Sequence, residues 1–210
     1  MESNPNNTPW FSATAYHFAQ TLYHSLDVPV GIIVCSWGGS RVESWTNREI
    51  LETYPDINLS KKGIEAVEEW KRPLVMYNGM LKPLTNFTIK GFIWYQGESN
   101  VGKHEDYPGR FATMVELWRK DWGLGNLPFY YAEIAPWIYG DGELGTSGAL
   151  LREAQFKSQF IIPNSGMIST NDLVEEYEKT NIHPKNKTDV GKRLAYMACN
   201  RTYELNSIAA

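Results

Sequence analysis

The sequence predicts one α/β domain in which a parallel sheet is covered by helices on both faces. Four apolar runs, rich in β-branched and aromatic residues, are typical of strands that are buried on both sides. Segments with apolar residues at helical spacing alternate with these runs, which indicates βαβ units in three layers. The 210 residues suit a single domain over 1–210, with no internal repeat and no long linker.

The chain begins with a predicted helix and a predicted strand. Residues 11–26 place apolar side chains at helical spacing after Ser12, which is a suitable N-cap. The run VGIIVCSW, residues 30–37, is predicted to be a buried strand that ends at Gly38 and Gly39.

The rest of the chain continues this alternation. The predicted elements are a short helix or turn region over 41–54, a largely helical segment over 60–81, a strand over 90–95, a helix over 107–123, a strand over 127–135, a helix over 146–160, a short strand over 166–172 and a helix over 188–203. Gly123 is expected to stop the helix that precedes it, and Thr188 to cap the last helix.

The composition excludes several classes of partner. The formal net charge is −4 and no dense cluster of Lys and Arg is present, so no nucleic-acid surface is predicted. No apolar run approaches the roughly 20 residues that cross a bilayer, so no membrane partner is predicted. The polar start MESNPNNTPW lacks the apolar core of a signal peptide. Two distant cysteines support neither a disulfide framework nor a cysteine metal site.

Aromatic residues make up 13% of the chain, and eight of them are Trp. This content predicts either a large aromatic core or a carbohydrate-facing groove in which rings stack on sugars. Trp37, Trp45 and Trp94 are the candidates for such a groove because they lie close in sequence to the polar motifs.

Two polar clusters follow predicted strands, at the sheet edge where open α/β folds bind ligands. The first, SWGGSRVESW (36–45), has two adjacent glycines, whose N–H groups can approach a ligand closely; a plain tight turn is the alternative. The second, WYQGESN (94–100), brings Gln96, Glu98 and Asn100 to the same edge. A cap for the next segment would explain the asparagine but not the amide and carboxylate before it.

The third cluster, NIHPKNKTDVGKRLA (181–195), places His183 just before the last helix. A lone histidine is more often solvated or structural, but this one lies in a polar loop after the last strand. A backbone N–H pair, an amide, a carboxylate and an imidazole at one edge favour acyl transfer with the imidazole as general base. Only one histidine stands in these clusters, and the chain has no HxH or HExxH spacing, so the sequence does not indicate a metal site.

The sequence resembles the SGNH-type esterases, and specifically the sialate O-acetylesterase-like family of carbohydrate O-acetylesterases. The matching segments are spread over nearly the whole chain: FSATAYHFAQTLYHSLDVPVGIIVCSWGGSRVESW, MYNGMLKPLTNFTIKGFIWYQGESN, EDYPGRFATMVELWRKDW, LREAQ, PNSGM and IHPKNKTDVGKRLA. The resemblance implies a three-layer α/β/α flavodoxin-like sandwich of the SGNH-hydrolase type. It also implies a serine esterase that removes O-acetyl groups from sialic acid or other acetylated sugars, without a metal or other cofactor, in a secreted or periplasmic setting.

The resemblance also implies roles at the site. His183 matches the catalytic base, and Glu98 matches the acid of the QGE motif. Gly39, with Gly38 beside it, matches an oxyanion donor, and Gln96 matches the polar residue that helps to hold the oxyanion.

One departure from the family concerns the nucleophile. The family's serine lies in a GQSNM-like block after the first strand, and this chain has no such block. We therefore expect a domain that is N-terminally incomplete relative to the family, with the first strand missing and the nucleophile unknown. The in-chain candidates are Ser36, Ser40 and Ser99. Ser40 is preferred because it lies in a glycine-rich turn, although GGS lacks the GxSxG elbow pattern.

A second departure concerns the charge beside the histidine. Family members often carry an acid shortly before it, whereas this chain has Asn181, and an amide cannot stabilise an imidazolium as a carboxylate does. Glu98 or Asp172 would then supply the charge, with Asn100 and Asn181 in supporting positions.

Three functional hypotheses remain open. The chain is an esterase whose nucleophile lies outside it, a catalytically inactive carbohydrate-binding or scaffolding protein of the same fold, or an active hydrolase with a relocated nucleophile. The expected partner is an O-acetylated carbohydrate, and the sequence does not reveal which sugar. An uncovered sheet edge would also favour self-association or pairing with a complementing N-terminal segment.

Overall fold

The computed structural model describes residues 2–140, 145–178 and 180–205. Within them, three parallel strands form one sheet in the order β1 (Phe92–Tyr95), β2 (Phe129–Ala132) and β3 (Ser165–Ile168). Phe92 lies opposite Phe129 in the register, and Phe129 lies opposite Ser165. These strands are shorter than the predicted runs but lie within or next to them.

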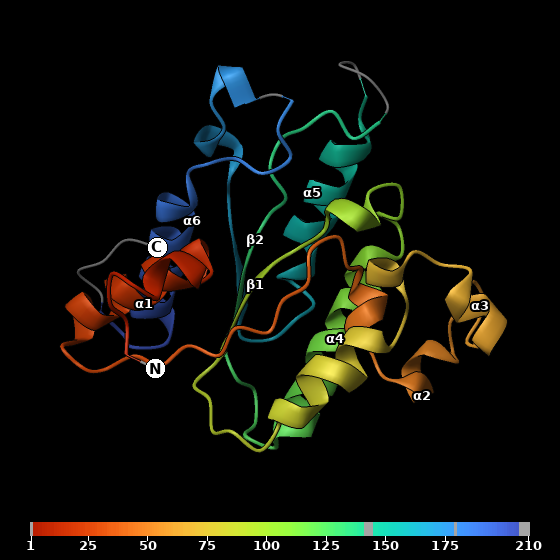
Figure 1. Cartoon of the computed structure of the whole chain (residues 1–210), viewed down its shortest axis with the longest axis horizontal. Helices are drawn as coiled ribbons and strands as arrows, with labels where there is room; N and C mark the ends of the chain where they lie inside the picture. The colour runs from red at the N-terminus through yellow and green to blue at the C-terminus, as the bar shows by residue number, and fades with distance from the viewer. Residues whose placement is uncertain (1, 141–144, 179, 206–210) are drawn as a thin grey trace.

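Helices cover both faces of the sheet. The α-helices of the described residues are α1 (Ala13–Leu26), α2 (Arg48–Leu51), α3 (Lys61–Glu65), α4 (Tyr107–Trp122), α5 (Ser147–Ser158) and α6 (Lys187–Arg201). Single helical turns lie at Thr8–Trp10, Val42–Trp45, Glu69–Lys71, Tyr77–Leu81, Lys82–Leu84, Glu98–Asn100, Asn171–Leu173 and Glu176–Glu178. α1 and α6 pack together on one face, and α4 and α5 lie on the other (Figure 1). The predicted three-layer class with a parallel sheet is confirmed.

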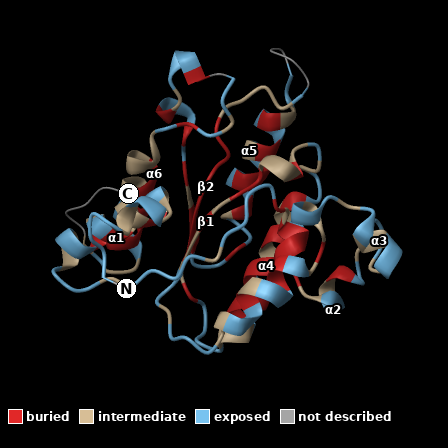
Figure 2. Ribbon diagram, viewed as in Figure 1, coloured by how far each residue is buried: buried red, intermediate tan, exposed pale blue. Residues whose placement is uncertain are grey.

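The side chains of β2 divide between two apolar cores because successive residues of a strand point to opposite faces. Tyr130 and Ala132 pack in the core that α6 covers. Phe129 and Tyr131 pack in the core that α4 covers. Figure 2 shows the strands and much of α4 as buried. No helix in the described part of the chain has the length and apolarity that crossing a membrane requires.

The tryptophans near the polar motifs belong mainly to the core. Trp45 and Trp94 are 1% and 8% exposed, and their ring centres lie 5.8 Å apart. Trp118 of α4 packs at 5.3 Å from Trp94. The prediction of a sugar-stacking groove is therefore wrong for Trp45 and Trp94, whereas Trp37 is 52% exposed.

The predicted buried strand over 30–37 is wrong. Among the described residues this segment pairs with no strand, and Ile33 and Val34 are 46% and 52% exposed. Figure 2 shows most of this stretch, between α1 and the Val42–Trp45 turn, as exposed. An apolar β-branched pattern identifies side chains that suit a sheet, but a strand forms only where a neighbour accepts its hydrogen bonds.

The predicted helical segment over 60–81 is broken into short pieces. Pro73 lies between the turn Glu69–Lys71 and the turn Tyr77–Leu81. Leu74 takes a left-handed φ of 74°, which no α-helix continues through. The segment is therefore largely helical, as predicted, but it consists of separate short helical pieces.

Two predicted helix ends are confirmed and one is wrong. Ser12 Oγ accepts the Ala15 N–H at 3.3 Å, and Gly123 ends α4 with a left-handed φ of 65°. Asn186, rather than Thr188, caps α6, because its Oδ1 accepts the Asp189 N–H at 3.1 Å. The helix therefore begins one residue earlier than predicted.

Candidate active site

The glycine turn follows the exposed segment 30–37. Gly39 has a left-handed φ of 75°, and a Cβ at this position would meet Trp70 Cδ1 at 2.7 Å. At Gly38 an added Cβ would meet open space. Both glycines are exposed, which leaves this side of the turn open to a ligand.

The carboxyl end of β1 holds this turn in place. Gln96 Nε2 donates to the Ser40 carbonyl at 2.9 Å and to Asn100 Oδ1 at 2.8 Å. Ser99 Oγ donates to the Gly39 carbonyl at 2.7 Å. The structure therefore brings the first two sequence clusters together. Both amide hydrogens of Gln96 are used within the protein, so its donation to an oxyanion stays a prediction and requires one of these bonds to break.

Gln155 of α5 connects the ends of β1 and β2 by hydrogen bonds. It was not identified from the sequence as a site residue. It is fully buried, its Nε2 donates to the Gln96 carbonyl at 2.9 Å, and its Oε1 accepts the Ile134 N–H at 2.9 Å. A Cβ at Gly97, which has φ of 153°, would meet this Nε2 at 2.8 Å. The available signal was its place at the end of the LREAQ segment.

His183 lies in an exposed loop that leads into α6. Asn181 Oδ1 accepts the His183 N–H, and Asn181 Nδ2 donates to the His183 carbonyl, each at 2.9 Å. The next residue, Pro184, is buried and anchors the loop. Asn181 thus holds the main chain of the histidine.

Glu98 is the carboxylate that interacts electrostatically with this loop. It is half-buried at the end of β1, and burial raises its pKa, while the nearby charges of His183 and Lys187 favour its ionised form. Lys187 is the first residue of α6, and its Nζ lies 5.1 Å from the centre of the Tyr95 ring. Burial lowers the pKa of Lys187, and Glu98 acts in the opposite direction. The third cluster therefore lies within electrostatic range of the second at Glu98.

Asp172, the other carboxylate offered by the sequence, is engaged elsewhere. Both of its oxygens accept from the guanidinium of Arg193, at 2.7 Å for Oδ1. These hydrogen bonds lower its pKa to about 2. Glu98, rather than Asp172, is therefore the carboxylate in electrostatic reach of His183.

The serines near the site differ in exposure. Ser40 is buried, its Oγ donates to the Trp37 carbonyl at 2.8 Å, and it accepts the indole N–H of Trp45 at 2.9 Å. A buried hydroxyl that is bonded on both sides is a poor nucleophile, so the geometry speaks against Ser40. Ser99 donates to the glycine turn, and Ser36 has an exposed side chain.

Two charged residues near the candidate site were not predicted from the sequence. Glu133 follows β2, is buried, and accepts from Ser169 Oγ at 2.6 Å and from the Thr170 N–H at 2.8 Å. Lys187 lies within the IHPKNK motif but reads as a solvated cation. The signal for Glu133 was a carboxylate directly after a buried strand. The position of Lys187 near Glu98 is revealed only by the tertiary fold.

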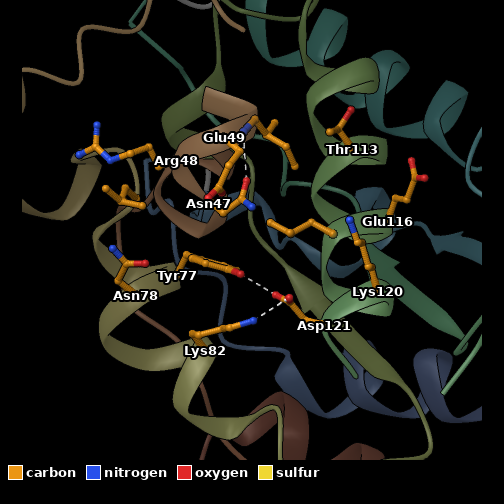
Figure 3. A pocket seen from close by; sticks show the side chains of 13 residues that line it. Asn47, Arg48, Glu49, Tyr77, Asn78, Lys82, Thr113, Glu116, Lys120 and Asp121 are labelled. Carbon is orange, nitrogen blue, oxygen red and sulfur yellow. Dashed lines mark hydrogen bonds and ion pairs between the residues drawn. The ribbon is translucent and has the colours of Figure 1, made fainter. Parts of the chain in front are cut away.

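A cavity of about 740 Å³ lies elsewhere, between α2, the turn Tyr77–Leu81 and α4. Figure 3 shows Tyr77 and Lys82 directed toward Asp121, with Tyr77 Oη donating at 2.6 Å and Lys82 Nζ at 2.7 Å. None of the predicted site residues lines it, so it is distinct from the candidate active site. In the described ranges, no group of three or more His, Cys, Asp or Glu is arranged to hold a metal ion.

Comparisons with known proteins identify a family for this chain. The family model described as carbohydrate esterase, sialic acid-specific acetylesterase, matches residues 7–200. The sialate O-acetylesterase of Homo sapiens is 29% identical over 93% of this chain and 41% of its own length, and that of Pongo abelii is 28% identical over the same shares. The chain thus spans about two fifths of the length of these relatives.

Two solved structures resemble the chain to different degrees. A carbohydrate acetylesterase from Xanthomonas citri superposes with a TM-score of 0.84 and 36% identity, covering 97% of this chain and 44% of its own. A protein from Arabidopsis thaliana, at 21% identity and a TM-score of 0.59, shares the fold over 91% of this chain and 68% of its own. The match of the family model to nearly all of the chain, on a fold shared with these structures, shows that the chain belongs to the sialic acid-specific acetylesterase family of carbohydrate esterases.

Proposed function

We propose that the chain acts in the hydrolysis of O-acetyl esters on carbohydrates. The observation that carries this proposal is the meeting of three sequence clusters at one sheet edge: Ser99 bonds Gly39, and Glu98 interacts with His183. A base, a carboxylate and an open glycine turn in one place suit acyl transfer. Sialic acid and acetylated xylose are the two sugars to compare.

In this mechanism a hydroxyl attacks the acetyl carbonyl while His183 takes its proton. The negative charge on the carbonyl oxygen is stabilised by N–H groups of the turn at Gly38 and Gly39. His183 then returns the proton to the sugar oxygen as the carbon–oxygen bond breaks. Water, deprotonated by the same imidazole, releases acetate and restores the hydroxyl. No metal ion is needed in these steps.

Glu98 supports the imidazolium form of His183 during the transfer, because a carboxylate stabilises a nearby positive charge. Ser36 is the in-chain serine to test as nucleophile, since its side chain is exposed. The alternative is a hydroxyl from a segment that is not part of this chain.

Hydrolysis of 4-nitrophenyl acetate tests the proposal, because this activated ester responds to an imidazole base even where no serine attacks. We expect the chain to exceed its His183→Ala variant by at least about tenfold, since general base catalysis contributes 10²–10⁴-fold. His24→Ala is the matched control, because His24 lies in the last turn of α1 and outside the site. Ser36→Ala separates an in-chain from an external nucleophile.

Acetate release from O-acetylated sialic acid and from acetylated xylan identifies the sugar. Equal rates for the chain and His183→Ala, together with saturable binding of either sugar, would favour the carbohydrate-binding alternative. Equal rates with no binding would contradict the proposal altogether.

We also propose that the chain self-associates through the free edge of its sheet. β1 pairs with β2 alone among the described strands, and Ile33 and Val34 expose apolar surface. Light scattering over a range of concentrations should show a dimer or larger species that Ile33→Lys/Val34→Lys disperses. A monomer at every concentration would contradict self-association and favour pairing of this edge with a complementing segment. An exported, secreted or periplasmic setting is proposed on family membership and is checked by cell fractionation.

A further inference from the structure

A buried ion pair lies behind the glycine turn. Arg110 of α4 and Glu43 of the turn Val42–Trp45 are both almost fully buried, and Arg110 Nη1 donates to Glu43 Oε1 at 2.8 Å. The other guanidinium nitrogen, Nη2, binds Asp56 at 2.7 Å and Asp106 at 3.1 Å. A carboxylate this deeply buried stays charged only where a cation pairs with it.

A chain of side-chain amides connects this pair to the turn. Glu43 Oε2 accepts from Asn100 Nδ2 at 3.1 Å. Asn100 Oδ1 accepts from the Val42 N–H at 3.2 Å and from Gln96 Nε2 at 2.8 Å. Gln96 Nε2 in turn donates to the Ser40 carbonyl at 2.9 Å. The path therefore runs from α4 to the residue that follows Gly39.

The charge on Glu43 fixes the direction of every bond along this path. An ionised carboxylate can only accept hydrogen bonds, so Asn100 must present its NH₂ group to it. The Asn100 oxygen then faces the donors, Val42 N–H and Gln96 Nε2. With a neutral partner in place of the carboxylate, the Asn100 amide could rotate so that its oxygen and nitrogen exchange places. The hydrogen bonds along the path would then have more than one possible direction.

We infer that Glu43, held by Arg110, is a positioning residue that fixes the glycine turn through Asn100 and Gln96. Its catalytic consequence rests on the proposed esterase function, whereas its effect on the turn does not. Nothing in the pair touches a ligand directly, since both side chains are buried behind the turn.

Amide hydrogen exchange followed by NMR tests the inference directly. The Val42 N–H bonds Asn100 Oδ1, so its exchange rate reports the position of Asn100. In Glu43→Ala we expect this rate to rise by about tenfold or more, because a local bond that depends on Asn100 is lost. Asp56→Ala is the matched control: it removes a carboxylate on the same guanidinium but off the path, and should change the Val42 rate less than about twofold. The Leu194 N–H, in the middle of α6, monitors global unfolding.

The esterase assay forms a second arm. Glu43→Ala should lower kcat for 4-nitrophenyl acetate by about tenfold or more with little change in KM, since misplacement of a reacting geometry by 1 Å costs up to about 10². Should Glu43→Ala not fold, Glu43→Gln keeps the shape and removes the charge, and the same comparison with Asp56→Asn applies. Faster Val42 exchange supports the inference whether or not the wild-type chain hydrolyses ester. Unchanged Val42 exchange in Glu43→Ala or Glu43→Gln, or an equal rise in the Asp56 control, overturns it.

Discussion

The side-chain amide of Asn181 makes two hydrogen bonds with the main chain of His183: its Oδ1 accepts the His183 N–H and its Nδ2 donates to the His183 carbonyl, each at 2.9 Å. The position at which the family often carries an acid thus serves here to fix the loop that carries the imidazole. Glu98, at the end of β1, is the carboxylate that interacts electrostatically with His183, and we propose that it supplies the charge that such an acid would have supplied.

Replacement of Asn181 by Ala should loosen this loop and lower hydrolysis. Two hydrogen bonds of about 1 kcal/mol each are lost, and each 1.36 kcal/mol in a barrier is tenfold in rate, so a loss of up to about 30-fold is expected. Steady-state hydrolysis of 4-nitrophenyl acetate measures it. Asn171→Ala, which removes an exposed amide bonded to Arg152 at 2.9 Å, serves as control. Full activity in Asn181→Ala would refute the role of this contact.

Replacement of Glu98 by Gln should raise stability at neutral pH while it lowers activity. Burial raises the pKa of Glu98 in the folded chain, so its contribution to folding is greatest below the unfolded pKa of about 4.3 and is lost as pH rises through the folded value. The Gln variant has no such titration, so its unfolding free energy should exceed that of the wild type at pH 7. This difference should vanish toward pH 4. Thermal unfolding at both pH values measures the gain. A variant less stable than the wild type at pH 7 would contradict the assignment of a raised pKa.

Replacement of Asp172 by Asn should leave hydrolysis within about twofold, because its carboxylate pairs with Arg193 at an exposed site where such pairs have small effects. Its pKa is lowered to about 2, so the stability it contributes is present above the unfolded pKa of 3.8 and is lost as pH falls through about 2. Parallel assays of Asp172→Asn and Glu98→Gln separate the two carboxylates. A larger loss in the Asp172 variant would reverse their assignment.

Replacement of Gly39 by Ala should destabilise the chain by about 1–2 kcal/mol, because a side chain disfavours a left-handed φ by this amount. The added Cβ would also press on Trp70. Gly38→Ala is the matched control, since its Cβ meets open space. Urea unfolding of both variants makes the comparison. Equal midpoints would show that the turn relaxes without strain.

Much of the architecture was readable from sequence because it depends on local patterns. The helical spacing that predicted α1, α4, α5 and α6, and the apolar runs that predicted β1, β2 and β3, are properties of consecutive residues. The same holds for the ends set by Ser12 and Gly123. The order of strands and helices alone implies a parallel, three-layer fold.

Other features were decided by contacts between residues far apart in the chain. The segment 30–37 carries a strand pattern but is unpaired, since pairing depends on a neighbour and not on its own side chains. Trp45 and Trp94 lie close to polar motifs in sequence, yet they are buried because three rings meet across the fold.

The site shows the same division. The sequence by itself predicted the candidate site residues, the glycine pair, Glu98 and His183, because their types and their positions after predicted strands are local properties. Only the tertiary structure decided that Glu98 rather than Asp172 interacts electrostatically with His183 and that Ser40 is buried. Both outcomes depend on which loops lie next to each other at the edge of the sheet. The packing of whole helices and strands determines this, and the residues of either loop alone do not.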